Sequence, residues 1–280
     1  MKPQNNIEAR ALKFDFRPFK KKYWYDNDPI RTLFANSICA SIPHGERFVI
    51  LCVMPFIKEL KNRTLKKQVV SFIRQESNHA NEHYRFFRHM IKPYYPELAI
   101  NKGLFFKITQ IGAFLLGKKI RLAMVAAVEH LTAITGELFL KEPSLSKGIN
   151  EELLLLWQWH FVEEIEHKAV AFDVLKETGS NYLTRMIGFI FVSLFMFAGF
   201  IKPFSHMVIK DKLYQKKAFY IQVFHFFWGQ LGVFRKLFVP YLKYTIPYFH
   251  PNKNDNKALL SEWNEYFVTI EKRIAEKSNA

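Results

Sequence analysis

Two Glu-x-x-His pairs, Glu76 with His79 and Glu164 with His167, have the residue types and spacing to bind a metal ion. Residues three apart share one face of a helix, so a carboxylate and an imidazole there can hold the same ion. Each pair lies within an apolar-periodic segment, where a charged side chain is rarely found unless it is paired or metal-bound. Imidazole suits iron, manganese or zinc, and a carboxylate can bridge two ions. The pairs therefore predict a buried metal site.

A site for two ions needs one further glutamate from each of two other helices, and Glu46 and Glu129 are available. The chain then supplies Glu, Glu-x-x-His, Glu and Glu-x-x-His in order, which is the known template of di-iron carboxylate proteins. Intervals of 30, 53 and 35 residues between successive glutamates suit two antiparallel helix pairs joined by one long crossover. Two plainer interpretations stay open. Glu46 could lie at a helix N-terminus and favour its dipole, and Glu129 could pair with Arg121.

Other acidic and imidazole side chains lie near these positions in the sequence. His83 shares the face of His79 and could be an alternative ligand, an outer partner or a core histidine. Glu137 lies two turns beyond Glu129 on the same face and would replace it if the helix register were different. Three residues lie off the ligand face and are expected in outer networks or in solvent: His130, Glu163 and Glu166.

The segments that carry these residues are predicted to be helical, and no alternating pattern predicts a strand. Pro43 would be the first residue of a helix that continues over Gly45–Leu60, because proline is favoured at that position. The other predicted helices cover 64–91, a short segment at 101–117, 118–142, 150–177 and 258–277. The fold class is therefore all-α, a ferritin-like four-helix bundle with additional helices.

The chain divides into four regions by composition. An N-terminal arm covers 1–30, the di-metal four-helix bundle 31–180, apolar and aromatic helices 181–250, and a polar tail with a helix 251–280. The only two cysteines, Cys39 and Cys52, lie in apolar stretches, which favours a reducing compartment. The N-terminus has no apolar segment of the secretory type, so a cytoplasmic location is expected, with association at the inner membrane left open.

The chain carries 41 Lys and Arg against 25 Asp and Glu, a net charge of +16. No zinc-finger, RNA-recognition or basic-helix signature accompanies this charge, so nucleic acid is not expected as a partner. Met186–Ile201 is almost purely apolar, but its 16 residues would span only about 24 Å as a helix, less than the ~30 Å hydrocarbon core. The following residues 216–249 mix aromatic with basic side chains. We expect either peripheral membrane contact or packing on the bundle.

Three segments resemble a bacterial family catalogued as predicted metal-dependent hydrolases: Pro43–Phe48, Gln75–His79 and Trp159–Asp173. That family is similar to ferritin-like di-iron proteins, especially the p-aminobenzoate N-oxygenase group. The resemblance covers roughly residues 30 to 250 and implies a third histidine ligand, His160, four residues before Glu164.

The resemblance also implies a role for each ligand. Two glutamates, Glu76 and Glu164, would bridge the ions, and the other two, Glu46 and Glu129, would be terminal ligands. His79 would bind one ion, and His160 and His167 the other.

Three functions are compatible with such a site. The first is oxidation of an apolar or aromatic small molecule by dioxygen at two iron ions, with an electron donor as a further partner. The second is hydrolysis at two metal ions, with manganese or zinc as alternatives to iron. The third is metal binding without catalysis. The absence of an evident general acid and of an anion-binding glycine loop makes us favour oxidation over hydrolysis.

Overall fold

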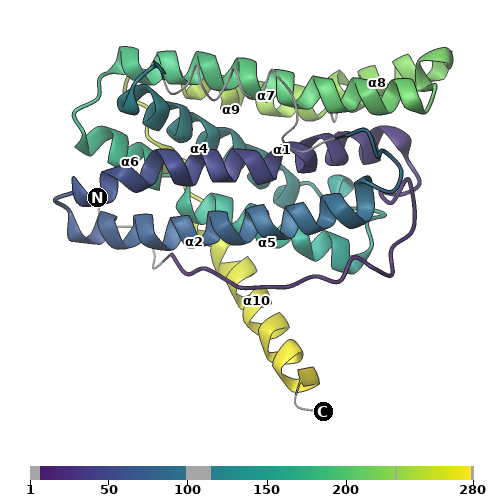
Figure 1. Cartoon of the computed structure of the whole chain (residues 1–280), viewed down its shortest axis with the longest axis horizontal. Coiled ribbons are helices and arrows are strands. Elements are labelled where there is room, and N and C mark those ends of the chain that lie inside the picture. Colours follow the sequence, from purple (N-terminus) through teal and green to yellow (C-terminus); the bar gives the residue numbers. More distant parts are fainter. Residues whose placement is uncertain (1–6, 99–114, 231, 279–280) are drawn as a thin grey trace.

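The computed structural model describes residues 7–98, 115–230 and 232–278, with side chains up to residue 270, and every regular element in these ranges is a helix. The α-helices, labelled in Figure 1 where there is room, are α1 (Pro29–Val53), α2 (Arg63–Phe86), α4 (Lys118–Lys141), α5 (Glu151–His167), α6 (Val170–Glu177), α7 (Tyr182–Lys210), α8 (Lys217–Trp228), α9 (Val233–Lys243) and α10 (Lys257–Ser278). The all-α prediction is confirmed for this part of the chain. The short helix predicted at 101–117 falls largely on 99–114, outside the described residues.

The helices lie in layers. α1 packs along α2, α4 packs along α5, and α7 covers both α1 and α4. Figure 1 shows α7, α8 and α9 along one side of the molecule, α1 and α4 in the middle, and α2 and α5 on the other side. The segment before α1 runs along α2 and α5, and α10 projects away from the layers. The middle and outer layers thus bring α1, α2, α4 and α5 around a common interior.

α1 starts earlier than the sequence predicted. Asp28 caps it, accepting hydrogen bonds from the backbone N–H groups of Ile30 and Arg31, and Pro29 occupies the first turn. The expected start at Pro43 was wrong, because the apolar residues before it continue the helix and Pro43 is buried inside it. This extension places Glu46 well within a 25-residue helix, so the dipole interpretation of Glu46 does not apply.

Two other predicted helices are interrupted. α2 ends at Phe86 and continues into a π-helical turn, Phe87–Ile91. The predicted helix 150–177 is two helices, because the chain turns after His167. At the break, the Nζ of Lys168 donates hydrogen bonds to the backbone oxygen of Asn254 and the side chain of Asn256. The break thus lies against a distant segment of the chain, a contact that no local pattern encodes.

α7 is longer than its apolar run. It covers 29 residues from the cap at Asn181, about 43 Å, so the sequence-based argument that it is too short to cross a membrane was wrong. Among the described residues, three helices have the length and apolar composition of a membrane span: Pro29–Lys58, Lys118–Lys141 and Tyr182–Lys210. The first two carry Glu46 and Glu129 inside the molecule, and only 22% of the apolar window in α7 is buried.

α7 approaches α4 closely at Gly188. A Cβ atom at this position would lie 2.6 Å from the backbone carbonyl carbon of Ala123, a distance that real Cβ atoms do not show. The facing stretch of α4 contains a run of buried small residues, including Ala126 and Ala127. Small side chains on both helices therefore set the distance between the apolar layer and the interior.

Candidate metal centre

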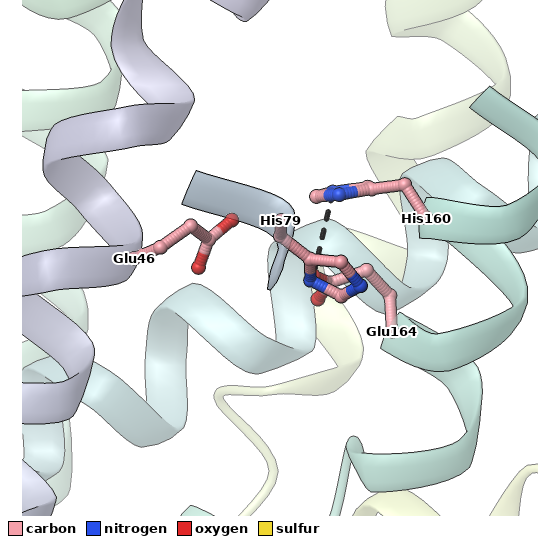
Figure 2. Close-up of side chains that lie close together, drawn as sticks. All are labelled: Glu46, His79, His160 and Glu164. Carbon is pink, nitrogen blue, oxygen red and sulfur yellow. Dashed lines mark ion pairs between the residues drawn. The ribbon is translucent and has the colours of Figure 1, made fainter. Parts of the chain in front are cut away.

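The structure brings all seven residues predicted as metal ligands together in the interior. They form two groups, and within each group the candidate ligand atoms all lie within 4.8 Å of one another. Group A contains Glu46, His79, His160 and Glu164, and group B contains Glu76, Glu129 and His167. Figure 2 shows the side chains of group A, with Glu46 reaching from α1 towards His79 and with His160 and Glu164 on α5. All seven side chains are buried.

Glu164 connects the members of group A. Its Oε1 lies 3.5 Å from the Nδ1 of His79 and 3.4 Å from the Nε2 of His160 (Figure 2). Glu46 completes the group from the opposite helix, α1. Two imidazole nitrogens and two carboxylates thus converge on one point from three helices.

His167 is the centre of group B. Its Nε2 lies 3.0 Å from Oε1 of Glu76, 3.1 Å from Oε2 of Glu129 and 3.3 Å from Oε2 of Glu164. Glu164 therefore faces group A with one carboxylate oxygen and group B with the other. Glu76 is placed in the same way, because its second oxygen lies 3.8 Å from the Nδ1 of His79. These are the positions that carboxylates bridging two ions would take.

The grouping of the histidines differs from that implied by the family resemblance. His160 lies in group A with His79, and not with His167. The reason is geometric, because residues seven apart lie two turns and roughly 10 Å apart along a helix. His160 and His167 on α5 therefore reach opposite ends of the cluster, with Glu164 between them.

The chemistry of the cluster fits metal ions. Several of its buried polar atoms have no hydrogen-bond partner: Oε1 and Oε2 of Glu76, Nδ1 of His79, Oε2 of Glu129, Nδ1 of His160 and Oε1 of Glu164. A buried polar atom without a partner costs free energy, and a buried carboxylate costs more. Cations bound among these oxygen and nitrogen atoms would satisfy them. The two buried groups of His and Glu side chains could therefore bind metal ions.

The electrostatics of the metal-free cluster agree with this interpretation. Burial raises the pKa of Glu46 and Glu76 well above their usual value and that of Glu129 to about 7. Burial acts against the charge of Glu164 as well, but His167 beside it holds its pKa well below the usual range. Without cations the cluster must retain protons on some of its glutamates, so metal binding and proton release are coupled.

The histidines are oriented from outside the cluster. Nε2 of His79 donates a hydrogen bond to Oε2 of Glu163 at 3.0 Å, which leaves Nδ1 facing group A. Nδ1 of His167 donates to Oε1 of Gln75 at 2.9 Å, which leaves Nε2 facing group B. Outer partners of this kind fix the tautomer of metal-binding histidines. Burial acts against a charge on His79, but the carboxylates of Glu163 and Glu164 beside it outweigh burial and raise the pKa of His79 to about 10.

Arg10 joins these outer partners. Its guanidinium contacts Glu163 at 3.2 Å and Glu166 at 2.7 Å, and Gln75 donates to Glu166 as well. A further bond runs from Arg10 to Asn264 of α10 at 2.6 Å. The prediction that Glu163 and Glu166 belong to outer networks is confirmed. No sequence signal assigned a role to Arg10, Gln75 or Asn264, because none stands at metal-ligand spacing and their partners are remote in the chain.

The remaining candidates lie outside the two groups. His83 is buried next to Cys39, with its ring 4.7 Å from that of His160, and burial lowers its pKa to about 3. Glu137 pairs with Lys141 on the surface, so the alternative register for α4 is wrong. His130 stacks on Tyr244 and contacts the backbone oxygen of Pro240. His83 is thus an outer neighbour of the cluster, as one of its interpretations allowed.

Comparison with known proteins identifies the class of the chain. Residues 8–255 match the family described as predicted metal-dependent hydrolase. Because the match covers most of the chain, the protein belongs to that family. No curated protein and no solved structure matches it. The family description agrees with the buried His and Glu groups, and the chain is a metal-dependent enzyme of this family.

Proposed function

We propose that the protein is a di-iron enzyme that oxidises an apolar or aromatic small molecule with dioxygen. The observation that carries the proposal is that Glu76 and Glu164 each face both buried groups. Four carboxylates and two histidines from four helices are the ligand set of di-iron carboxylate proteins, and His160 adds a third histidine to it here. On this view α1, α2, α4 and α5 form a ferritin-like four-helix bundle, and the other helices are additions to it.

The positions of the side chains support the following ligand roles. Glu76 and Glu164 would each contact both ions. Glu46, His79 and His160 would complete one coordination sphere, and Glu129 and His167 the other. Two iron ions bound there would supply the electrons that activate dioxygen, and an external electron donor would restore them. Manganese or zinc remain alternatives, because imidazole and carboxylate bind them too.

A small apolar pocket of about 40 Å³ lies beside the cluster, and it would have to widen to hold the proposed substrate. It is lined by side chains of α1, α4, α5, α8 and α9, among them Phe34, Trp157 and Phe226. Trp157 contacts the ring of His83 at 5.2 Å, and Phe161, also in the lining, contacts that of His160 at 5.6 Å. A pocket without charged residues selects apolar or aromatic molecules, and one aromatic layer separates it from group A. Reorientation of Trp157 or Phe161 would open the way to the cluster.

Hydrolysis is the second candidate, and the family description favours it. In a hydrolase the same two ions would activate water and stabilise the leaving oxygen. The proposed cytoplasmic location is compatible with either reaction and agrees with two free, buried cysteines.

Metal analysis of protein from iron-supplemented cells, combined with spectroscopy, distinguishes these functions. The oxidase proposal expects close to two iron ions per chain, an absorption band that dithionite bleaches and oxygen restores, and oxygen consumption with apolar substrates. Colourless zinc or manganese protein that cleaves ester, amide or phosphoester bonds would establish the hydrolase instead. Folded protein with well under one metal ion per chain after anaerobic iron loading would rule out both.

A further inference from the structure

The outer surface of α7 is apolar. Ile190, Leu194 and Phe197 are 57%, 63% and 62% exposed, and their spacing of four and seven residues places them on one side of the helix. The opposite side of α7 packs on α1 and α4, where Ser41 donates a hydrogen bond to the backbone oxygen of Gly199 at 3.0 Å. An exposed stripe of large apolar side chains over two turns is unusual on a surface that faces only water.

α8 and α9 extend this stripe into a broad surface. They join α7 through ring contacts of Phe227 with Phe200 and Phe234, and through a hydrogen bond from Tyr241 to Ser193. Figure 1 shows the three helices on the same side of the molecule. We call this surface the apolar face; its exposed members are Ile190, Leu194, Phe197, Tyr220, Ile221, Phe224, Trp228, Phe238, Val239, Leu242 and Ile246.

The charge carried by residues 181–250 is almost entirely of one sign, although two of the lysines pair with glutamates of neighbouring segments, Lys210 with Glu97 and Lys236 with Glu142. Residues 181–250 contain one acidic residue, Asp211, and nine basic ones: Arg185, Lys202, Lys210, Lys212, Lys216, Lys217, Arg235, Lys236 and Lys243. The Asp211 side chain is 1% exposed and is held by Lys22, Tyr23 and Tyr95. The surface of this region therefore presents no carboxylate of its own. Exposed lysines, among them Lys212, Lys216 and Lys217, gather at the turn between α7 and α8.

We propose that the apolar face docks on the surface of a membrane that contains anionic lipids. The exposed aromatic and aliphatic side chains of α7, α8 and α9 would enter the boundary between headgroups and acyl chains. The lysines at the α7–α8 turn would contact lipid phosphates. This combination is that of interfacial helices, in which apolar burial and attraction to anionic lipid act together. A protein partner would need an equally large apolar surface edged with acidic groups, whereas an anionic membrane offers both features over any area.

The packing of α7 favours docking over crossing. A helix that crossed the membrane alone would be surrounded by lipid, but one side of α7 is fixed to α4 at Gly188 and to α1 at Ser41. α1 and α4 carry Glu46 and Glu129, so a crossing α7 would bring buried carboxylates to the depth of the hydrocarbon. One exposed side and one packed side correspond to a helix that lies along the interface.

Vesicle flotation tests this proposal. The probes are vesicles of phosphatidylcholine with and without phosphatidylglycerol, each at low and high salt, with purified full-length protein. We expect flotation with the anionic vesicles and less with neutral ones. Leu194→Glu/Phe224→Glu should bind at least about tenfold more weakly, because two apolar anchors are lost. Lys212→Gln/Lys216→Gln/Lys217→Gln should lose about fivefold per charge on anionic vesicles and should lose nothing on neutral ones.

Val70→Glu is the matched control, since Val70 is exposed and belongs to α2, the helix that lies in the layer away from α7 (Figure 1). This control should float like the wild type. Helical content and metal content, measured for every variant, show that the fold is retained. Equal flotation of the wild type and Leu194→Glu/Phe224→Glu would overturn the proposal. A second result would also overturn it: wild-type protein that binds neither kind of vesicle but forms a dimer, with Leu194→Glu/Phe224→Glu monomeric. The apolar face would then be covered by a second copy of the chain. If the protein were released from cell membranes by detergent but not by high salt, it would span the membrane and not dock on its surface.

Discussion

The interior between α2 and α5 and the surface of α7–α9 reverse the usual distribution of residues in opposite ways. In the interior, Glu76 and His167 are fully buried, and Glu164 is 1% exposed. On the surface, large side chains such as Phe197 are more exposed than buried. Ordinary folding does neither, because buried charge and exposed apolar area both cost free energy. Each reversal is consistent with a missing partner, and the two partners that we propose differ in chemistry: cations for the interior and lipid for the surface.

The largest effect is expected from Glu164→Ala, which tests the interior side of this comparison. Glu164 faces both groups of ligands, so its loss should remove most of both metal ions, while Glu137→Ala should leave metal content unchanged. Elemental analysis of the purified variants measures the difference. Full metal content in Glu164→Ala would show that this carboxylate does not bridge.

Glu163→Ala should have a smaller effect on the same quantity. Glu163 accepts a hydrogen bond from His79 but lies outside both ligand groups. Loss of such an outer partner should weaken metal affinity by ~10–100-fold and leave the number of sites at two. Titration against a competing chelator measures the affinity. Glu163→Gln, which keeps an acceptor oxygen, should recover part of it, and a stoichiometry of one ion would contradict the assignment.

The contact between the two regions is tested at Gly188. A Cβ there would meet the backbone of Ala123, so Gly188→Ala should lower the free energy of unfolding by about 1–3 kcal/mol, as overpacking does. Gly199→Ala in the same helix is the control, since its nearest atom is Ser41 Oγ at 3.4 Å. Alanine is a better helix former than glycine, so this control should be neutral or slightly stabilising. Chemical denaturation compares the two, and equal stabilities would disprove the close approach.

The smallest effect is expected for Leu194→Gln on stability. Its side chain is 63% exposed, so the free energy of unfolding should change by no more than about 0.5 kcal/mol. Vesicle binding should still weaken, which would separate the role of the apolar face from that of the interior. A stability loss of several kcal/mol would mean that Leu194 is part of the core in solution.

Local signals predicted the helix ends less well than the residues that meet in the interior. Glu-x-x-His spacing depends only on helical periodicity, and the four residues that it singled out converge in the structure. They are joined there by Glu46 and Glu129, which the four-helix template supplied, and by His160, which the family resemblance supplied. Pro43 misled because proline at a helix start and proline inside a helix look alike in sequence, and the decisive cap at Asp28 lies 15 residues earlier. The full length of α7 was not predicted either, because the helix continues at both ends beyond its apolar part.

The arrangement around the ligands could not be predicted from one sequence. Whether His79 meets His160 or His167 depends on the direction of α5 relative to α2, and the family resemblance implied a different grouping, with His160 and His167 together. Arg10 lies 153 residues from Glu163, and nothing near either residue encodes the contact. The sequence shows the residues of the apolar face only as an apolar and aromatic composition, which core helices share. Their exposure in the folded chain is what distinguishes them from core residues.

The bond between Arg10 and Asn264 joins residues 254 positions apart and has a consequence for biosynthesis. In synthesis from the N-terminus, α10 follows every residue of the candidate metal centre. A growing chain can therefore bring the seven residues together, with Glu163 and Gln75 behind the histidines, before Asn264 meets Arg10. An ion bound at the proposed site during that interval would lack one support behind Arg10 and would exchange more readily than after α10 has packed.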